Sequence, residues 1–372
     1  MSDLPADGFT EAELLPLPGG RGRRPLSGAA SALLRPLGLG ARLLDRVEFV
    51  VDHSTTANSR GARHIRGGIS VATAVLAVVL SLKAFADGAA PGPAHVVIAM
   101  VAVALYTNHF GRFLRDWCPV AILIGAYAAA FGIVQGLSLH VWYWPQIHAD
   151  EVIGLGQLPT YRLQDWFGAG HNHALAVLSA LGYLSHFIVP PIFGFYLWWM
   201  RRGAGFREYM YSLIAVNLLA SVLWILAPTA PPWLAAQQGL IAAPVDVLRM
   251  GLQDLGFTQL VAFKDSNTYL IAAALPSIHA SWPILGLLVA RKYRLAVPIQ
   301  AALLTQLLVV WFVIVYSGEH YVIDIVFGVA FSLGAWWLIQ RLRTARQAGR
   351  ASSAERLLEG VSAEPGALVP SR

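Results

Sequence analysis

Long apolar runs constrain this chain more than any other feature of its sequence. A helix needs about 20 residues to cross the ~30 Å hydrocarbon core of a membrane. Eight runs approach or exceed that length: 68–86, 93–109, 117–138, 172–200, 208–228, 272–290, 295–316 and 320–340. The chain is also 56% apolar and only 13% charged, whereas a soluble domain carries about 25% charged residues. We therefore expect an all-α, polytopic integral membrane protein with about eight transmembrane helices.

The predicted spans divide the chain into four parts. Residues 1–66 are polar and contain many Gly, Pro and Arg residues, so we expect a largely disordered cytoplasmic tail there. Residues 67–110 are expected to hold two accessory transmembrane helices, and residues 111–341 a six-helix catalytic core. Residues 342–372 form a second polar tail, also predicted to be cytoplasmic. The outer loop 229–271 is too long for a simple connector, which predicts short interfacial helices within it.

The basic residues predict the orientation of the spans. With a cytoplasmic N-terminus, the alternation of spans places every basic cluster on the cytoplasmic side, and only Lys83, Arg162, Arg249 and Lys264 fall outside. This distribution follows the positive-inside rule. Both termini are therefore predicted to be cytoplasmic, in a multi-pass protein of the plasma membrane. The net charge of +6 then faces anionic lipid headgroups, which argues against a nucleic-acid partner. The sequence leaves the oligomeric state open.

The composition argues against a metal or disulfide framework. Cys118 is the single cysteine, which excludes an internal disulfide and any CxxC metal site. None of the usual metal-binding motifs is present in the sequence. We therefore expect no metal and no cofactor.

Four polar residues are predicted to meet at the extracytoplasmic ends of two helices. Ser277 and His279 lie in "PSIH" at the start of the sixth span, and His320 and Asp324 lie in "HYVID" at the start of the eighth. The seventh span runs between them, so both pairs fall at the same level of the membrane. His320 and Asp324 are four residues apart and share one helix face. A carboxylate there can accept the Nδ1–H of His320 and leave Nε2 free as a nucleophile.

The neighbouring residues suggest supporting roles. His279 can supply or remove a proton as an acid or base, and Ser277 can donate a hydrogen bond to a phosphate oxygen. A lone histidine in an apolar helix is more often structural. An aspartate within a membrane span, however, is usually functional, and its convergence with two histidines and a serine favours a catalytic site.

These motifs resemble those of a known family. "PSIH" at 276–279 and "HYVID" at 320–324 are similar to the second and third signature blocks of the lipid phosphatase/phosphotransferase superfamily, the type 2 phosphatidic acid phosphatases. "APTAPPW" at 227–233 and "YLSHFIVPP" at 183–191 resemble further blocks of the branch that contains the inositol phosphorylceramide and sphingomyelin synthases. The resemblance covers roughly residues 110–340. It implies that His320 attacks a lipid phosphodiester, with Asp324 orienting it and His279 protonating the departing oxygen. It also implies a phosphohistidine intermediate and no metal.

The departures from the phosphatase pattern favour the transferase branch. Ile278 stands where the phosphatases have a glycine, and no matching Lys–Arg block is present to hold the phosphate. Lys264 and Arg162 remain as outer cations, and Lys264 ranks higher because it is nearer to His279 in sequence. Tyr183 and His186 share one helix face and are predicted either to line the substrate cavity or to tie helices together.

The predicted function is the transfer of a phosphate-containing headgroup between lipids, with a phospholipid or polyprenyl phosphate as substrate. A lipid phosphate or diphosphate phosphatase is the alternative within the enzyme class, because it differs only in using water as the acceptor. A non-catalytic haem or metal protein with His279 and His320 as ligands is an alternative of a different class. A lipid transporter is a further alternative, although the sequence lacks paired broken helices in two matching halves.

Overall fold

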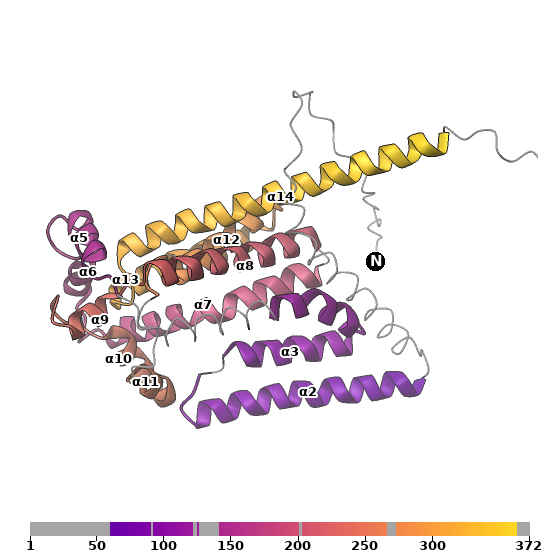
Figure 1. Cartoon of the computed structure of the whole chain (residues 1–372). Helices are drawn as coiled ribbons and strands as arrows, with labels where there is room; N and C mark the ends of the chain where they lie inside the picture. Colours follow the sequence, from indigo (N-terminus) through magenta and orange to yellow (C-terminus); the bar gives the residue numbers. More distant parts are fainter. Residues whose placement is uncertain are drawn as a thin grey trace, which may run out of the picture. The chain divides into compact units, whose positions relative to one another are not determined.

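The computed structural model describes residues 60–90, 92–121, 125, 141–200, 203–265 and 273–362. Every named element in these ranges is an α-helix, accompanied only by isolated β-bridges. The all-α fold class predicted from the sequence is confirmed. The longer helices are α2 (Arg60–Ala86), α3 (Pro93–Tyr106), α7 (His173–Trp199), α8 (Gly203–Leu226), α12 (Ile278–Lys292), α13 (Val297–Tyr316) and α14 (Val322–Ser362). They lie alongside one another (Figure 1).

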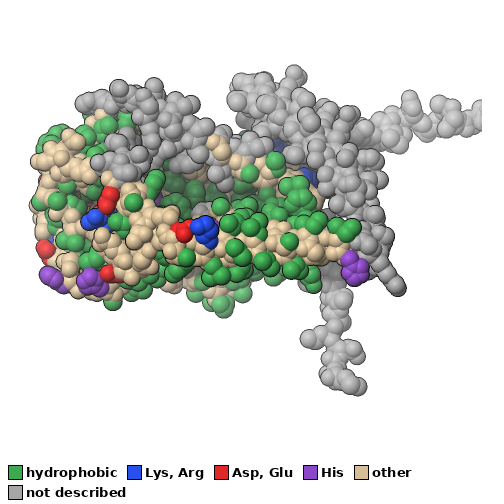
Figure 2. Space-filling view, turned by 90° about the horizontal axis from the view of Figure 1, so that it is seen from below, with side chains coloured by type: hydrophobic (Ala, Val, Ile, Leu, Met, Phe, Trp, Pro, Cys, Tyr) green, Lys and Arg blue, Asp and Glu red, His purple; other side chains and the backbone are tan. Residues whose placement is uncertain are grey.

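Five of the described helices are long and apolar enough to cross a membrane. These spans are Gly67–Ala86, His173–Trp199, Gly203–Leu226, Val297–Tyr316 and Val322–Gly349. Large apolar side chains on them are exposed, including Val75, Leu82, Leu178, Val222 and Leu308. Figure 2 shows such side chains covering much of the helical surface on the side where α2 lies. Surfaces of this kind are stable in contact with lipid, so these helices support a polytopic membrane protein.

The other three predicted spans are shorter or fall outside the description. Helix α3 has 14 residues and α12 has 15. The predicted sixth span, 272–290, therefore starts too early: residues 273–277 are not helical, because Pro276 lacks an amide hydrogen and Ser277 caps the helix that follows. Most of the run at 117–138 lies outside the described residues.

Two helices extend across predicted boundaries. Helix α2 begins at Arg60, so it extends into the segment 1–66 that was assigned to the disordered tail; residues 1–59 lie outside the description. Helix α14 continues without a break from Val322 to Ser362, well past the boundary predicted at 342. Its polar extension is still composed of good helix formers such as Ala, Arg, Glu and Leu.

Helix α12 occupies the centre of the helix packing, because it contacts α7, α8, α13 and α14. The largest group of buried apolar residues includes Leu285 and Val289 of α12, Leu197 of α7, Val216 of α8 and Leu303 of α13. Helices α2 and α3 pack against each other, and α3 packs against α7. This packing fixes the first turn of α12, where His279 lies, among the neighbouring helices.

Short helices gather at one end of the long ones (Figure 1). Three of them lie in the outer loop, where short helices were predicted: α9 (Pro232–Gln237), α10 (Val247–Asp254) and α11 (Thr258–Asp265). Helix α10 packs along α7. Two further helices, α5 (Trp144–Ile153) and α6 (Pro159–Phe167), were not predicted; α5 contacts α14 and α6 contacts α13. The short helices therefore surround the N-terminal ends of α12 and α14.

Candidate active site

Ser277 fixes the start of helix α12. Its hydroxyl oxygen accepts a hydrogen bond from the amide of Ala280 at 3.2 Å, which is the usual geometry of a helix N-cap. The side chain is fully buried. His279 follows in the first turn of the helix. Ser277 thus contributes to the local structure beneath His279, and donation to a phosphate oxygen stays a prediction for it.

The segment that leads into Ser277 is held by the loop 227–233. The Oγ1 atom of Thr229 accepts a hydrogen bond from the amide of Leu275 at 2.8 Å, and the backbone of Thr229 forms β-bridges with Trp142 and Ala273. Thr229 is 2% exposed. The proline-rich motif therefore has a structural task here, since it aligns the non-helical residues that precede α12.

A carboxylate from another helix caps the start of α14. Asp150 of α5 accepts hydrogen bonds from the amides of Val322 at 2.8 Å and Ile323 at 2.9 Å. These amides belong to the first turn of α14 and have no partner within the helix. Burial, the largest effect, raises the pKa of Asp150 to about 6; the two amide hydrogen bonds lower it, and the charge of Asp324 raises it further. Asp150 is fully buried and anchors the helix that begins just after His320.

Helices α12 and α14 approach each other closely at the site. A Cβ atom at Gly328 would lie 2.7 Å from the backbone oxygen of Ser277, so only glycine fits there. The amide of Ser277 donates to the backbone oxygen of Asp324 at 3.1 Å. The hydroxyl of Ser281 donates to the oxygens of Ser277 at 2.7 Å and Gly328 at 3.1 Å. These bonds set the spacing between the two histidine-bearing turns.

The two histidines and the aspartate form a continuous chain of hydrogen bonds. Nδ1 of His320 lies 3.2 Å from Oδ2 of Asp324, and Nε2 of His320 lies 3.2 Å from Nδ1 of His279. The same Oδ2 atom accepts the amide of Tyr321 at 3.0 Å. A carboxylate only accepts hydrogen bonds, so the contact assigns the His320 proton to Nδ1 and the lone pair to Nε2. The Nδ1–H of His279 then donates to this lone pair. The structure thus brings together three residues that the sequence predicted to be neighbours.

Tyr183 and His186 of α7 lie directly against His279. The centre of the His279 ring is 4.7 Å from that of Tyr183 and 4.4 Å from that of His186. His186 is 2% exposed and also stacks on Trp282 at 4.4 Å. It is 13 residues after the first residue of α7, which is about 20 Å along the helix. The site is therefore recessed from that end of α7, and α10 packs along the intervening turns.

Lys264 forms an ion pair with the residue that precedes His320. Its Nζ atom is 2.5 Å from Oε1 of Glu319, the residue before His320, and 3.5 Å from Oδ1 of Asp246. Burial is the largest single effect and lowers the pKa of Lys264, but the two carboxylates together raise it above its usual value. Lys264 is therefore charged at neutral pH. Gly318, at a φ of 71°, makes the turn that presents Glu319.

A mostly apolar pocket of about 230 Å³ lies beside these groups. It is lined by Tyr183 and Phe187, whose rings both contact His279, and by Lys264. Leu248 and Leu252 of α10 and residues of the α2–α3 connection complete its wall. An apolar cavity with one cation, next to an activated imidazole, suits the chain of a lipid whose phosphate lies at the histidines.

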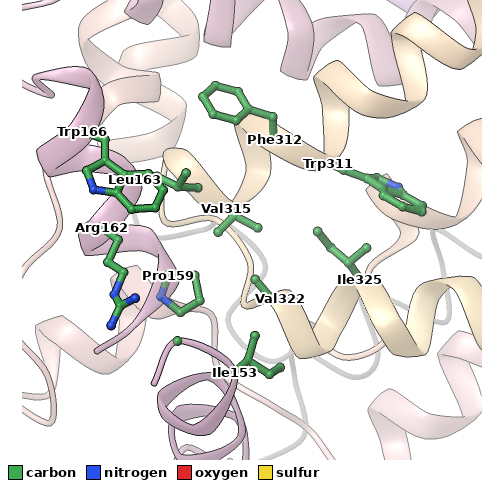
Figure 3. Close-up of a pocket in the computed structure, with 11 residues that line it drawn as sticks. Ile153, Pro159, Arg162, Leu163, Trp166, Trp311, Phe312, Val315, Val322 and Ile325 are labelled. Carbon is green, nitrogen blue, oxygen red and sulfur yellow. The ribbon is translucent and has the colours of Figure 1, made fainter. Parts of the chain in front are cut away.

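Arg162 lies elsewhere. It belongs to α6 and lines a second pocket, of about 420 Å³, between α6, α13 and α14 (Figure 3). The two pockets share no lining residue. The structure therefore places Lys264 beside Glu319, the residue before His320, and Arg162 at a pocket formed by the last turns of α13 and the first turns of α14. This separation agrees with the higher rank that the sequence gave to Lys264.

Three residues that shape the site were not predicted from the sequence. Glu319 precedes His320 in the sequence, but the sequence does not show that Glu319 is buried and paired with Lys264. Thr229 lies inside a recognised motif, but its bond to the segment before α12 is a tertiary contact. Asp150 gave no signal, because an aspartate in a polar loop is ordinary and only the folded chain brings it to α14.

The described residues hold no group of three or more His, Cys, Asp and Glu side chains arranged to bind a metal ion. The distance between the nearest ring nitrogens of His279 and His320 is 3.2 Å. A haem iron bound between two imidazoles would need these nitrogens about 4 Å apart, given metal–nitrogen bonds of about 2.0 Å. As described here, the rings are hydrogen-bonded to each other.

Comparisons with known proteins identify the family of this chain. The family model of the PAP2 superfamily matches residues 148–338, from α5 to α14 and just over half of the chain. The chain belongs to this superfamily, and the family predicted from its motifs is confirmed. Residues 111–147 of the predicted six-helix core lie outside the match.

A curated relative lies in the predicted branch. The chain is 26% identical over 177 residues to the phosphoinositol dihydroceramide synthase of Bacteroides thetaiotaomicron. The match covers 46% of this chain and 58% of the relative, so the chain spans less than two thirds of the relative's length. No solved structure matches the chain. The family and this relative support a membrane enzyme that acts on lipid phosphates, as a transferase or a phosphatase.

Proposed function

We propose that this protein is a lipid phosphotransferase that moves a phosphate-containing headgroup from a phospholipid to the hydroxyl of a second lipid. The observation that carries the proposal is the hydrogen-bonded chain from Asp324 through His320 to His279. It leaves the Nε2 lone pair of His320 next to a proton donor, in a buried site beside a lipid-sized pocket. The name of the relative makes a phosphoinositol donor and a dihydroceramide acceptor the first pair to test.

In the first half of the reaction, Nε2 of His320 attacks the phosphorus of the donor. The bond between phosphorus and the oxygen of the donor lipid breaks as the nitrogen–phosphorus bond forms. His279 enters this step as an imidazolium, which the negative phosphodiester favours, and its Nδ1–H protonates the departing oxygen. The phosphorylated His320 ring becomes cationic, and the carboxylate of Asp324 balances that charge through the Nδ1–H bond.

In the second half, the hydroxyl oxygen of the acceptor attacks the same phosphorus. Nδ1 of His279, now without its proton, takes the hydroxyl proton, and the bond between His320 and phosphorus breaks. Both histidines return to their starting states, so no oxidant, reductant or metal is required. Lys264 offsets the charge of the transferring group, and the 230 Å³ pocket holds a lipid chain against the ring of Tyr183. By the positive-inside rule, these steps take place on the extracytoplasmic face of the plasma membrane.

The test is turnover of labelled phospholipids and polyprenyl phosphates by purified protein in detergent that contains EDTA. Each lipid is supplied with and without dihydroceramide or diacylglycerol as the acceptor. We expect wild-type protein to produce a new phospholipid and His320→Ala to lose activity by at least about 10³-fold. His279→Ala should lose about 10²–10⁴-fold. His173→Ala is the matched control, because this histidine also pairs with an aspartate but is exposed, at the start of α7.

Acid-labile label on wild-type protein that is absent from His320→Ala supports the phosphohistidine. Release of free phosphate or phospho-headgroup without a new lipid would favour the phosphatase alternative. Equal activity of wild type and both variants would overturn the mechanism. A Soret band in the purified protein would favour the haem alternative.

A further inference from the structure

The pocket between α6, α13 and α14 is built unlike the one beside Lys264. Figure 3 shows Arg162 and Trp166 of α6 on one side of it. Trp311 and Phe312 of α13 and Ile325 of α14 line the other side. The pocket has a volume of about 420 Å³, and Trp166 is 73% exposed. A cation thus lies at an apolar cavity that opens next to an exposed tryptophan, the arrangement found where side chains meet lipid headgroups.

Arg162 differs from the other predicted outer cations in its partners. Lys83 pairs with Asp87, Arg249 with Asp265, and Lys264 with Glu319. Within the ranges that the structure describes, no carboxylate lies within ion-pair distance of Arg162, whose hydrogen bond goes to the backbone oxygen of Leu155 at 3.4 Å. A guanidinium presents a planar set of donors that binds phosphate with two hydrogen bonds. The charge of Arg162 is therefore available to an anionic ligand.

One wall of this pocket belongs to α14, the helix that carries Asp324. Val322 and Ile325 line it, and Ile325 follows Asp324 in the first turns of α14. The indole Nε1 of Trp311 donates to the backbone oxygen of Ala280, next to His279, at 3.1 Å. A ligand in the pocket thus lies one helix wall away from the histidines.

We propose that this pocket is a second lipid site, which binds a glycerophospholipid through its phosphate at Arg162 and through an acyl chain against Trp311 and Phe312. A phosphate at the mouth fits the guanidinium, and an apolar chain fits the wall. This assignment goes beyond the histidine site. If the site holds the phospholipid donor before transfer, that role rests on the proposed function. The binding of the lipid to the pocket does not.

The experiment is photo-crosslinking in full-length His320→Ala protein, so that turnover does not affect the result. The probe is a phosphatidylinositol with a diazirine and an alkyne on one acyl chain, and the comparison probe is diacylglycerol with the same chain. Both are added in dodecyl maltoside micelles free of other phospholipids, and adducts are mapped by mass spectrometry of peptides. We expect the phosphatidylinositol probe to label α6, α13 and the first turns of α14 at least about 5-fold more than the diacylglycerol probe.

Two pairs of variants separate specific binding from general lipid contact. Arg162→Gln should reduce phosphatidylinositol labelling to the diacylglycerol level, whereas Arg249→Gln, an outer arginine that does not line the pocket, should leave it unchanged. Ile153→Trp should fill the pocket mouth and reduce labelling by both probes. Its neighbour Val152 is 76% exposed and does not line the pocket, so Val152→Trp should have no effect.

Equal labelling by the two probes, unchanged in Arg162→Gln and Ile153→Trp, would overturn the site and indicate surface lipid only. Adducts confined to α7, α10 and α11 would also overturn it. The outcome is distinguishable from failure of the proposed function, since labelling of the His320→Ala protein requires no catalysis. In the active protein, a donor role predicts that Arg162→Gln raises the KM for the phospholipid about 5- to 10-fold with little change in kcat.

Discussion

Two buried carboxylates lie at opposite ends of the helix packing, and the difference between their partners is instructive. Asp324, at the start of α14, is bonded to the imidazole of His320 and to the amide of Tyr321. Glu208, in the first turns of α8, is bonded to the ammonium of Lys292 at 2.9 Å, to the amide of Gln340 at 3.1 Å and to the guanidinium of Arg343. Both carboxylates are 2% exposed or less.

The charge of Glu208 is already balanced by two cations, Lys292 and Arg343. This cluster therefore ties α8, α12 and α14 together, and its carboxylate has no unbalanced charge with which to stabilise another cation. The partners of Asp324 are formally neutral when His320 carries one proton. Its negative charge is balanced only when the imidazole becomes cationic, as it would in the proposed attack on phosphorus. We therefore infer that the buried carboxylate without a cationic partner, Asp324, can stabilise a charge that develops during a reaction. The buried carboxylate with two cationic partners, Glu208, stabilises the fold.

The largest effect should follow from changing Asp324 alone. Asp324→Asn keeps the shape of the side chain, but it removes the charge that stabilises the cationic ring and replaces one acceptor oxygen with a donor NH2 group, so the tautomer of His320 is no longer enforced. We expect kcat to fall about 10³–10⁴-fold, measured as turnover per mole of folded protein. The matched control is Asp254→Asn, because Asp254 also accepts from a histidine, His173, at 2.7 Å but lies away from the site. Similar activities of the two variants would contradict the proposed role of Asp324.

The titration of Asp150 should make the stability of the folded protein depend on pH. Its folded pKa is about 6 and its ordinary value is 3.8, so between these values the folded protein keeps a proton that the unfolded chain has lost. The stability of wild type relative to Asp150→Asn should therefore fall as pH rises from about 4 to 6, by on the order of 3 kcal/mol, and stay level above that range. Thermal unfolding in detergent across this range measures it.

The neighbouring residue provides the control for this experiment. Glu151 is exposed and pairs with His148, so Glu151→Gln should unfold with the same pH dependence as wild type. If the unfolding temperatures of wild type and Asp150→Asn changed with pH in the same way, the carboxylate of Asp150 would not titrate between about pH 4 and 6 in the folded protein.

The smallest effect on activity should come from changing Glu208, the carboxylate that is paired with two cations. Glu208→Gln leaves Lys292 and Arg343 without their anion, but both cations are partly exposed and can turn to solvent. We expect a loss of stability of about 2 kcal/mol, seen as a lower unfolding temperature, with unchanged activity per folded molecule. A variant of normal stability that lost its turnover would show that this cluster also takes part in catalysis.

The sequence by itself determined the fold class and the family, and it predicted that His279, His320 and Asp324 would be neighbours. Hydropathy is a local property, so the apolar runs at 172–200, 208–228 and 295–316 mark α7, α8 and α13 closely. The spacing of His320 and Asp324 places them on one helix face by geometry alone. The short connections that join the sixth, seventh and eighth spans likewise limit how far His279 can lie from His320.

Tertiary structure decided the rest, because it depends on contacts between residues far apart in the chain. Only packing shows that His186 reaches His279 and that Asp150 caps a helix about 170 residues later. Charge pairing is also a property of the folded chain. The sequence shows four outer cations alike, and the structure gives three of them carboxylate partners and sets Arg162 at a pocket of its own.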